Sequence, residues 1–526
     1  MKELLQTRKI KQAGWKKEYV ILLILIIAVL WRIAAACTHF THYDDICLIV
    51  SILQSGDRIW DKLHYNSVIH WTYAPLQCWM IGLLVDASYS YEVNLFLGRM
   101  PSLVFSILNI FLVYHFYKKK YKDERDFYEK AVAVFMISIS WELVIYAAQS
   151  EPYSIGLTGL LFLMLEFQNI AQKKEIKEIR LILIGAVVGY MQYQLFIFVF
   201  CFFIAVFCVV WKEKEKLIRS VLCSMGSLLL ELPVIKDFLE SGMLERGTNW
   251  NVGNNCRFLF QSDAFRGFEK VTYMFEFFTE NLMIWFRSMF VYKDSIWYTD
   301  LLAVCLIVLV LMGVLYEIRT RNTLSIFLML SVCFHVVLIL DGKLAFSPSR
   351  HTMIFIPIVI YYIAASVKFL QGMQIGNLLL RFGCLVYAAI LILTGVTFCT
   401  EWKLRKNRIS TEVLETWIME ENPIFIGSYD GVMDLELMRL VGYEQAFAGK
   451  WKSGETLQTG DVMILFSRSK VTEQTEHALL DGYLNGKKFE RMKVVEIASD
   501  TEIEYAHGVF FNLGNGFYKY SYRVID

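Results

Sequence analysis

Two adjacent carboxylates, Asp44 and Asp45, follow the first long apolar run of the chain and lie close to the imidazole of His42. A carboxylate at a membrane boundary is partly desolvated, and both burial and a like-charged neighbour raise its pKa toward that of a general base. Asp is also a good N-cap for the apolar segment that begins at Ile46. From this motif alone, a catalytic base and a helix cap are equally compatible with the sequence.

Cationic side chains lie at the ends of two apolar runs. Arg99 lies near the start of the second long apolar run, and Lys343, Arg350 and His351 belong to a short turn before a late run. A guanidinium at such an end can bind a phosphate through two hydrogen bonds, or it can extend its head group to water. The turn with Lys343 and Arg350 is suited to an anionic head group.

Two prolines add rigid loops with polar and aromatic neighbours. Tyr73 and Pro75 open a short apolar segment, and Gln149 and Tyr153 flank a turn that contains Pro152. Proline fixes its own φ and favours an extended residue before it, so these loops hold a defined shape. The short segment either walls a pocket at the membrane surface or rests on the bilayer as an amphipathic helix.

Apolar runs supply the elements that must position these residues. A membrane crossing needs about 20 mainly apolar residues. Runs of this kind occur at 19–37, 96–117, 130–148, 153–170, 180–195, 196–211, 217–235, 298–317, 323–340, 351–367 and 377–398. The segment 74–85 is shorter and fits an interfacial or re-entrant position. The sequence predicts an all-α polytopic membrane domain of about eleven transmembrane helices within residues 19–400.

The positions of Lys and Arg predict the orientation of the chain. Basic residues crowd the N-terminal segment 1–18, whereas the loop 38–96 contains only Arg58 and Lys62. Basic residues concentrate on the cytoplasmic side of membrane proteins. We therefore expect a cytoplasmic N-terminus, and we expect all of the candidate residues above to gather at the extracytoplasmic face.

The composition changes after residue 400. Residues 401–526 are more charged, and strand-like runs at 424–427, 462–466, 493–497 and 517–523 alternate with helix-like runs at 435–441 and 473–484. This pattern predicts a small C-terminal α/β domain. With eleven spans before it, the domain is expected to be extracytoplasmic.

The overall composition fits a membrane protein and excludes some functions. Of 526 residues, 56% are hydrophobic and 20% are charged, the net charge is +1 and the mean hydropathy is +0.43. No overall basic charge exists to hold a nucleic acid, so no such partner is expected. The 11 cysteines show no CxxC or His-rich spacing, which predicts neither a disulfide framework nor a metal site.

Taken in order over about residues 20–400, these motifs resemble the GT-C superfamily of integral-membrane glycosyltransferases. The similar branch contains protein O-mannosyltransferases and bacterial enzymes that use polyprenyl-phosphate sugars. Asp44-Asp45 resembles the acidic pair of the family, whose second member is usually Glu, and residues 73–76 stand in place of His-Pro-Pro-Leu. Residues 99–102 resemble Arg-x-Pro-Ser.

Two later motifs carry the same resemblance with changes. Glu151-Pro152-Tyr153 keeps the frame of the Arg-Pro-Tyr turn of the family, with an acid in place of Arg. Arg350-His351 resembles its Arg-Tyr pair.

The resemblance implies transfer of a sugar from a polyprenyl-phosphate donor to a hydroxyl of a glycan, lipid or protein acceptor, with inversion. It implies a bacterial inner or plasma membrane and no metal or other cofactor. In this reading Asp44 is the general base, and Asp45 shapes the local field. The donor phosphate is bound by Arg99, Arg350 and Lys343. The substrate pocket is lined by His42, Tyr73, Pro75, Gln149, Tyr153 and His351.

Two other classes fit parts of the pattern. A lipid flippase or transporter also needs many spans and a few intramembrane charges. Its usual inverted repeat is not visible in the hydropathy, and the charged groups gather at one surface instead of the midplane. A surface-glycan polymerase or ligase shares lipid-linked donors, but its usual large Arg-rich outer loop is not evident.

Overall fold

The structure is a computed structural model. It describes residues 2–37, 48–49, 52–53, 74–86, 88–89, 91–121, 126–173, 175–240, 267–289, 297–340, 344, 346, 352–372, 386, 389, 425–428, 458–467, 471–472, 488–497 and 517–525.

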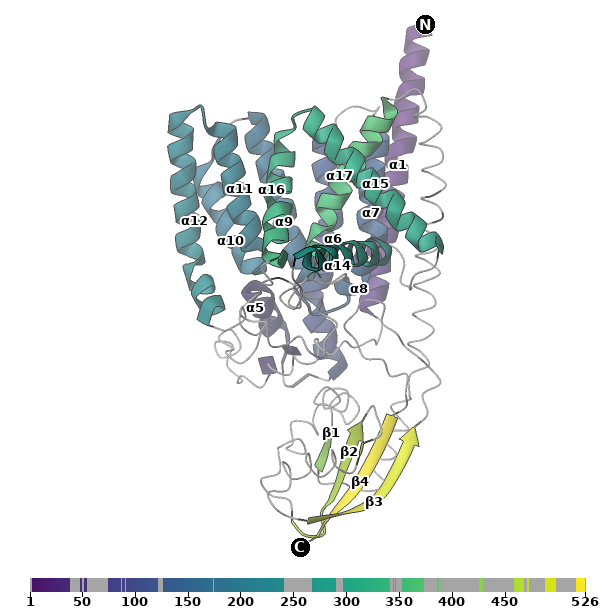
Figure 1. The fold of residues 1–526 in the computed structure, drawn as a ribbon. Helices are drawn as coiled ribbons and strands as arrows, with labels where there is room; N and C mark the ends of the chain where they lie inside the picture. Colours follow the sequence, from purple (N-terminus) through teal and green to yellow (C-terminus); the bar gives the residue numbers. More distant parts are fainter. Residues whose placement is uncertain are drawn as a thin grey trace.

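Most of the described chain forms a bundle of helices that run side by side, with one helix lying across its end (Figure 1). The helices are α1 (Lys2–Ala36), α5 (Pro75–Leu84), α6 (Tyr91–Lys120), α7 (Phe127–Ile139), α8 (Trp141–Ala147), α9 (Tyr153–Lys173), α10 (Glu178–Met191), α11 (Leu195–Val210), α12 (Lys214–Glu240), α14 (Gly267–Ser288), α15 (Trp297–Arg319), α16 (Thr323–Leu340) and α17 (Ile356–Gln371), which a short 3-10 turn (Met353–Phe355) precedes.

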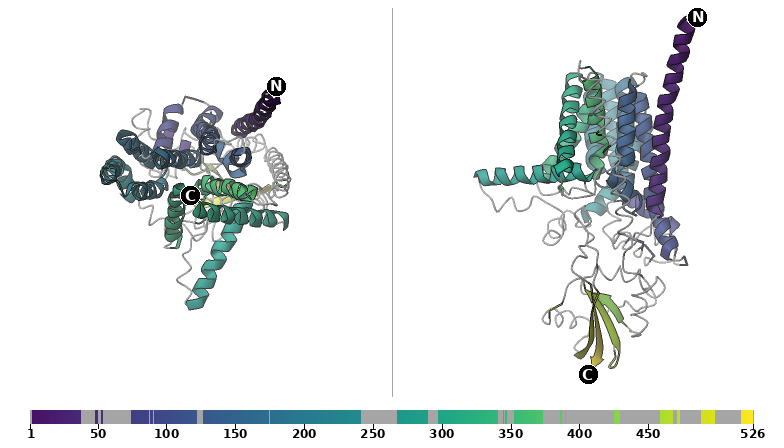
Figure 2. Two further views of the ribbon diagram at one scale, coloured as in Figure 1. Left: turned by 90° about the horizontal axis from the view of Figure 1, so that it is seen from above. Right: turned by 90° about the vertical axis from the view of Figure 1, so that its right-hand side faces the viewer.

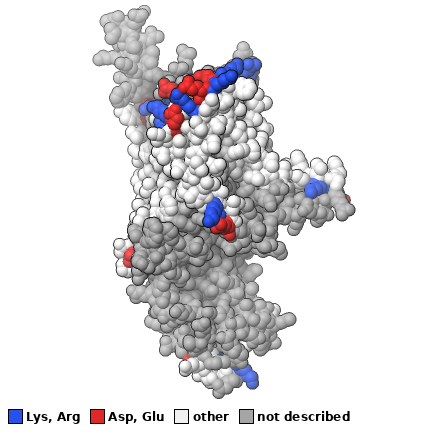
Figure 3. Space-filling model, turned by 90° about the vertical axis from the view of Figure 1, so that its left-hand side faces the viewer, with Lys and Arg blue, Asp and Glu red and all other residues white. Residues whose placement is uncertain are grey.

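Seven stretches are long and apolar enough to cross a membrane, which confirms the membrane character that the composition predicts. They are Glu18–Ala36, Val93–Lys120, Tyr153–Gln172, Lys214–Lys236, Thr299–Arg319, Thr323–Leu340 and Met353–Gln371. Each coincides with an expected crossing. Charged side chains gather at the end of the bundle that holds the N-terminus, and a broad band below them is almost uncharged (Figure 3).

The other expected crossings differ or lie outside the described residues. The run 130–148 is divided between α7 and α8, with Ser140 between them. The runs 180–195 and 196–211 form α10 and α11, of 14 and 16 residues, joined by a tight turn. The segment 74–85 forms α5, whose 10 residues span only about 15 Å. The run 377–398 is outside the described part, apart from two single residues.

Aromatic side chains fill the centre of the bundle. Phe167 of α9, Phe202 of α11 and Phe327 of α16 are fully buried, and the ring centroids of Phe167 and Phe327 are 5.7 Å apart. The helices α15 and α17 pack still more closely, because a Cβ on Gly313 would lie 1.8 Å from the carbonyl oxygen of Tyr362. Small residues allow such close backbone contact between membrane helices.

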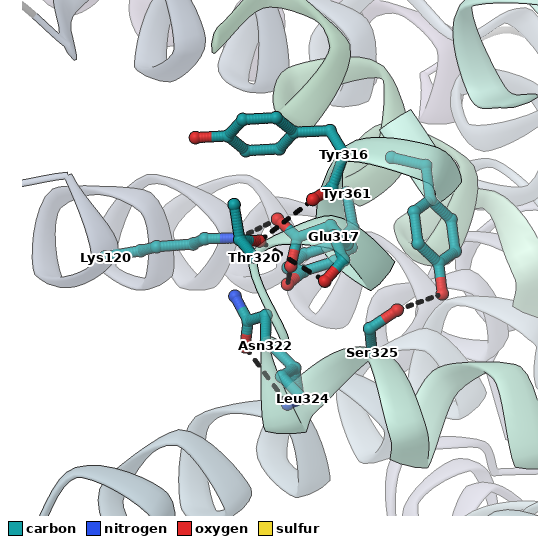
Figure 4. A network of polar contacts seen from close by, with 9 residues as sticks. Lys120, Tyr316, Glu317, Thr320, Asn322, Leu324, Ser325 and Tyr361 are labelled. Carbon is teal, nitrogen blue, oxygen red and sulfur yellow. Dashed lines mark hydrogen bonds and ion pairs between the residues drawn. The ribbon is translucent and has the colours of Figure 1, made fainter. Parts of the chain in front are cut away.

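A buried polar network ties three helices together at the end of the bundle where α6 and α15 finish (Figure 4). The Lys120 Nζ lies 3.0 Å from Glu317 Oε1 and 3.8 Å from the centre of the Tyr361 ring. The Tyr361 hydroxyl donates to Glu317 Oε2 at 2.6 Å. The neighbouring Lys368 of α17 pairs with Asp126 near the start of α7. Pairing and hydrogen bonding together offset the cost of removing these charges from water.

The C-terminal residues contain a four-stranded sheet in the order β1-β2-β4-β3. Its strands are β1 (Phe425–Ser428), β2 (Val462–Ser467), β3 (Lys488–Ile497) and β4 (Phe517–Ile525), so each expected strand is present. The pair β1 and β2 is parallel, and β4 runs antiparallel to both of its neighbours. One face buries Met463, Leu465, Tyr520 and Tyr522. Ser521 on the other face is buried too. The helix-like runs expected at 435–441 and 473–484 lie outside the described residues, so the α/β character of this part stays a prediction.

Candidate functional site

Three segments that are far apart in the sequence are joined by hydrogen bonds at the end of the bundle opposite the charged end. The Gln77 amide of α5 donates to the Ser102 hydroxyl of α6 at 2.9 Å and to the Ser150 carbonyl at 3.1 Å. The Ser102 hydroxyl donates to the Glu151 carbonyl at 2.9 Å. Pro75 begins α5, where its missing N–H leaves no helical hydrogen bond unmade. The start of α5, the first turns of α6 and the turn 148–152 therefore form one unit.

Arg99 lies one helical turn before Ser102, so both side chains share a face of α6. The residue is only 2% exposed, so its guanidinium is buried and does not extend to water. The backbone packs closely here, since a Cβ on Gly98 would lie 2.6 Å from Ile49 Cδ1 and 3.2 Å from Ser150 Oγ, and the Ile49 side chain would have to shift. The beginning of α6 is thus pressed against both the turn 148–152 and the segment around residue 49.

The contact with Ile49 bears on the acidic pair, which itself lies outside the described residues. Leu48 and Ile49 are buried in an apolar cluster with Cys78 and Ile81 of α5 and Leu95 of α6. Leu48 follows Asp45 by three residues in the sequence.

The turn 148–152 and the start of α9 bury several polar groups. Gln149, Glu151 and Tyr153 are all buried, and the rings of Tyr146 and Tyr153 meet edge to face at 4.8 Å between centroids. Burial raises the pKa of the Cys78 thiol well above its ordinary value, and the charge of Glu151 raises it further. The turn that carries Glu151 contacts α5 through the hydrogen bond from Gln77 to the Ser150 carbonyl.

A second buried guanidinium, that of Arg32 in α1, joins α1 to α6 and to the end of α7. Its Nε donates to Ser106 Oγ of α6 at 2.8 Å. Its two terminal nitrogens donate to the carbonyls of Ile137 and Ser138 at 2.7 and 3.0 Å, in the last turn of α7. A cation at a helix C-terminus satisfies open carbonyls and is favoured by the helix dipole. Arg32 thereby fixes the break between α7 and α8, and α8 leads directly into the turn 148–152.

The structure brings together the expected site residues that it describes. Pro75, Arg99 and Gln149 lie in the unit of α5, α6 and the turn 148–152, and Tyr153 follows this turn as the first residue of α9. The others lie outside the described residues: His42, Asp44, Asp45, Tyr73, Lys343, Arg350 and His351. Within the described part, no group of His, Cys, Asp and Glu side chains is arranged to hold a metal ion.

Two residues of this region were missed by the sequence reasoning. Arg32 is a lone charge in an apolar run, and an intramembrane ionisable group with a specific partner is itself a signal of importance. Gln77 follows Pro75 by two residues, but its partners come from α6 and from the turn 148–152, which a linear pattern does not identify.

No known family model matches this chain, and no curated protein is significantly similar to it.

Proposed function

We propose that this chain is a GT-C-like membrane glycosyltransferase. It moves a sugar from a polyprenyl-phosphate donor to an acceptor hydroxyl at the extracytoplasmic face. The observation that carries the proposal is the hydrogen-bonded unit of α5, α6 and the turn 148–152, which includes the buried Arg99. These segments hold three of the five motifs on which the resemblance to this superfamily depends.

The proposed reaction is a single displacement with inversion at the sugar. Asp44 removes the proton of the acceptor hydroxyl while the acceptor oxygen attacks the anomeric carbon. The bond between that carbon and the phosphate oxygen breaks, and polyprenyl phosphate leaves. Arg99, with Arg350 and Lys343, stabilises the charge that grows on the phosphate. Asp45 shapes the field around the base.

The placement of the polar groups favours this reaction over lipid translocation. A translocator needs its polar groups along a path through the membrane, near its midplane. Here Gln77, Arg99 and the turn 148–152 gather at one end of the bundle, and the apolar cluster of Leu48 and Ile49 brings the chain that follows the acidic pair to the same end. A site at one surface suits a donor whose head group lies at that surface and an acceptor that arrives from water.

The test is transfer of radiolabel from a panel of polyprenyl-phosphate sugars to membrane extracts that contain the full chain. We expect transfer from one donor by the wild type and its loss in Asp44→Asn and Arg99→Ala. The exposed Glu240→Gln and Arg219→Ala serve as matched controls and should retain activity. Absence of transfer from every donor at normal expression would contradict the proposal and make lipid translocation the next measurement.

A further inference from the structure

The helix α14 is long enough to cross a membrane but does not run with the spans. Its 22 residues cover about 33 Å, yet it is absent from the seven stretches that qualify as crossings. It lies across the bundle at the end that holds α5 and α8, and its free end projects well beyond the neighbouring helices (Figures 1 and 2). A helix in this position runs along the boundary of the apolar band.

The C-terminal half of α14 is anchored to the bundle. Trp285 and Phe286 are buried, and the Trp285 ring meets that of Phe355 at 6.5 Å between centroids. Arg287 Nη1 pairs with Asp300 Oδ1 of α15 at 2.7 Å. These contacts fix the direction in which the rest of the helix leaves the bundle.

The N-terminal half carries large apolar side chains that are exposed. Phe268, Val271 and Phe275 are 84%, 60% and 68% exposed. With 3.6 residues per turn, these positions lie on one side of the helix. The exposed Glu269 and Glu276 lie roughly a quarter of a turn or more away, on the charged side. One apolar side of α14 therefore packs on the protein through Phe277 and Phe278, whereas the side of Phe268, Val271 and Phe275 is exposed.

We infer that α14 is an interfacial helix that binds the lipid surface, with Phe268, Val271 and Phe275 inserted at the boundary of head groups and acyl chains. An amphipathic helix with aromatic residues on its apolar side binds a bilayer in this orientation. Leu301 and Val304, near the start of the candidate span α15 to which α14 is anchored, are exposed apolar side chains as well. The position of α14 at the boundary of this apolar band favours lipid over a protein partner. The inference is independent of the proposed transferase reaction.

The experiment places a photo-crosslinking amino acid in the full chain at Phe275 or at its neighbour Glu276, and in a second pair at Phe268 or Glu269. Each variant is reconstituted in vesicles of phosphatidylethanolamine and phosphatidylglycerol that contain an alkyne-bearing phospholipid. We expect several-fold more lipid adduct from position 275 than from 276, and from 268 than from 269. Unchanged elution in size-exclusion chromatography verifies that each variant folds.

Three results would overturn the inference. Equal lipid adducts within each pair, or no lipid adduct at any of the four positions, would show that the apolar side does not face lipid. A protein adduct from positions 268 and 275 that grows with the number of protein molecules per vesicle would assign the surface to a second copy of the chain.

Discussion

The guanidinium of Arg32 donates hydrogen bonds to three acceptors that are buried away from water. The carbonyls of Ile137 and Ser138 lie at the broken end of α7, and Ser106 contributes its hydroxyl from α6. Loss of the side chain leaves buried acceptors unsatisfied, which costs about 1 to 3 kcal/mol for each of them.

We therefore expect Arg32→Met to lower the thermal unfolding midpoint markedly in detergent, although Met suits an apolar environment. Arg219→Met, at an exposed position of α12, should leave the midpoint unchanged. Equal midpoints for wild type and Arg32→Met would show that Arg32 does not hold the end of α7.

Gln77 links α5 to both α6 and the turn 148–152, so its role is in positioning. Gln77→Leu preserves the volume but removes two hydrogen bonds of about 1 kcal/mol each. We expect it to reduce transfer by up to roughly thirtyfold while the protein stays folded, since about 1.4 kcal/mol corresponds to a factor of ten. The comparison is initial rates at saturating donor. Full activity in Gln77→Leu would show that these hydrogen bonds do not position the site.

At the level of elements, the contact between α15 and α17 depends on one missing side chain. A Cβ at Gly313 would collide with the backbone oxygen of Tyr362, which no rotamer change relieves. We expect Gly313→Ala to destabilise the protein by about 1 to 3 kcal/mol, measured as the shift of the thermal midpoint. Gly226→Ala is the matched control, because its added methyl would meet only the flexible side chain of Ile182 at 3.2 Å.

The elements that the sequence predicts well are those with a strong local signal. Seven long apolar runs became helices of spanning length, and four strand-like runs became the sheet. The break at Ser140 was not predicted, because the sequence stays apolar on both sides and the break is held by Arg32, 106 positions before Ser138. The helix α14 lies between the expected crossings 217–235 and 298–317 and was not predicted, although its amphipathic period is readable in the sequence.

In the candidate site, too, features with a local signal were predictable, whereas features that depend on packing were not. The sequence proposes Arg99, Gln149 and Tyr153 as site residues from their types and their positions at span ends, and the structure shows that all three are buried. It could not identify the hydrogen bonds from Gln77 that join α5, α6 and the turn 148–152, because these depend on how helices pack.

At the scale of the whole molecule, the distribution of charge predicts a topology that can be measured. Eleven crossings would place the two ends of the chain on opposite sides of the membrane, with the N-terminus in the cytoplasm. A reporter that fluoresces only in the cytoplasm should be bright when fused before Met1 and dark when fused after Asp526. Two bright ends would mean an even number of crossings and would move the C-terminal sheet to the cytoplasmic side.

The short hairpin of α10 and α11 has a consequence for the surrounding lipid. Helices of 14 and 16 residues cover about 21 and 24 Å, against about 30 Å of hydrocarbon in a typical bilayer. Ile179, Leu183 and Val187 of α10 face outward along this shortened surface. Lipid beside a hydrophobic surface that is too short must compress to match it, at a modest cost per ångström. The protein should therefore unfold at a higher temperature in membranes of shorter acyl chains, and a thickness-independent unfolding temperature would show that the hairpin does not deform its bilayer.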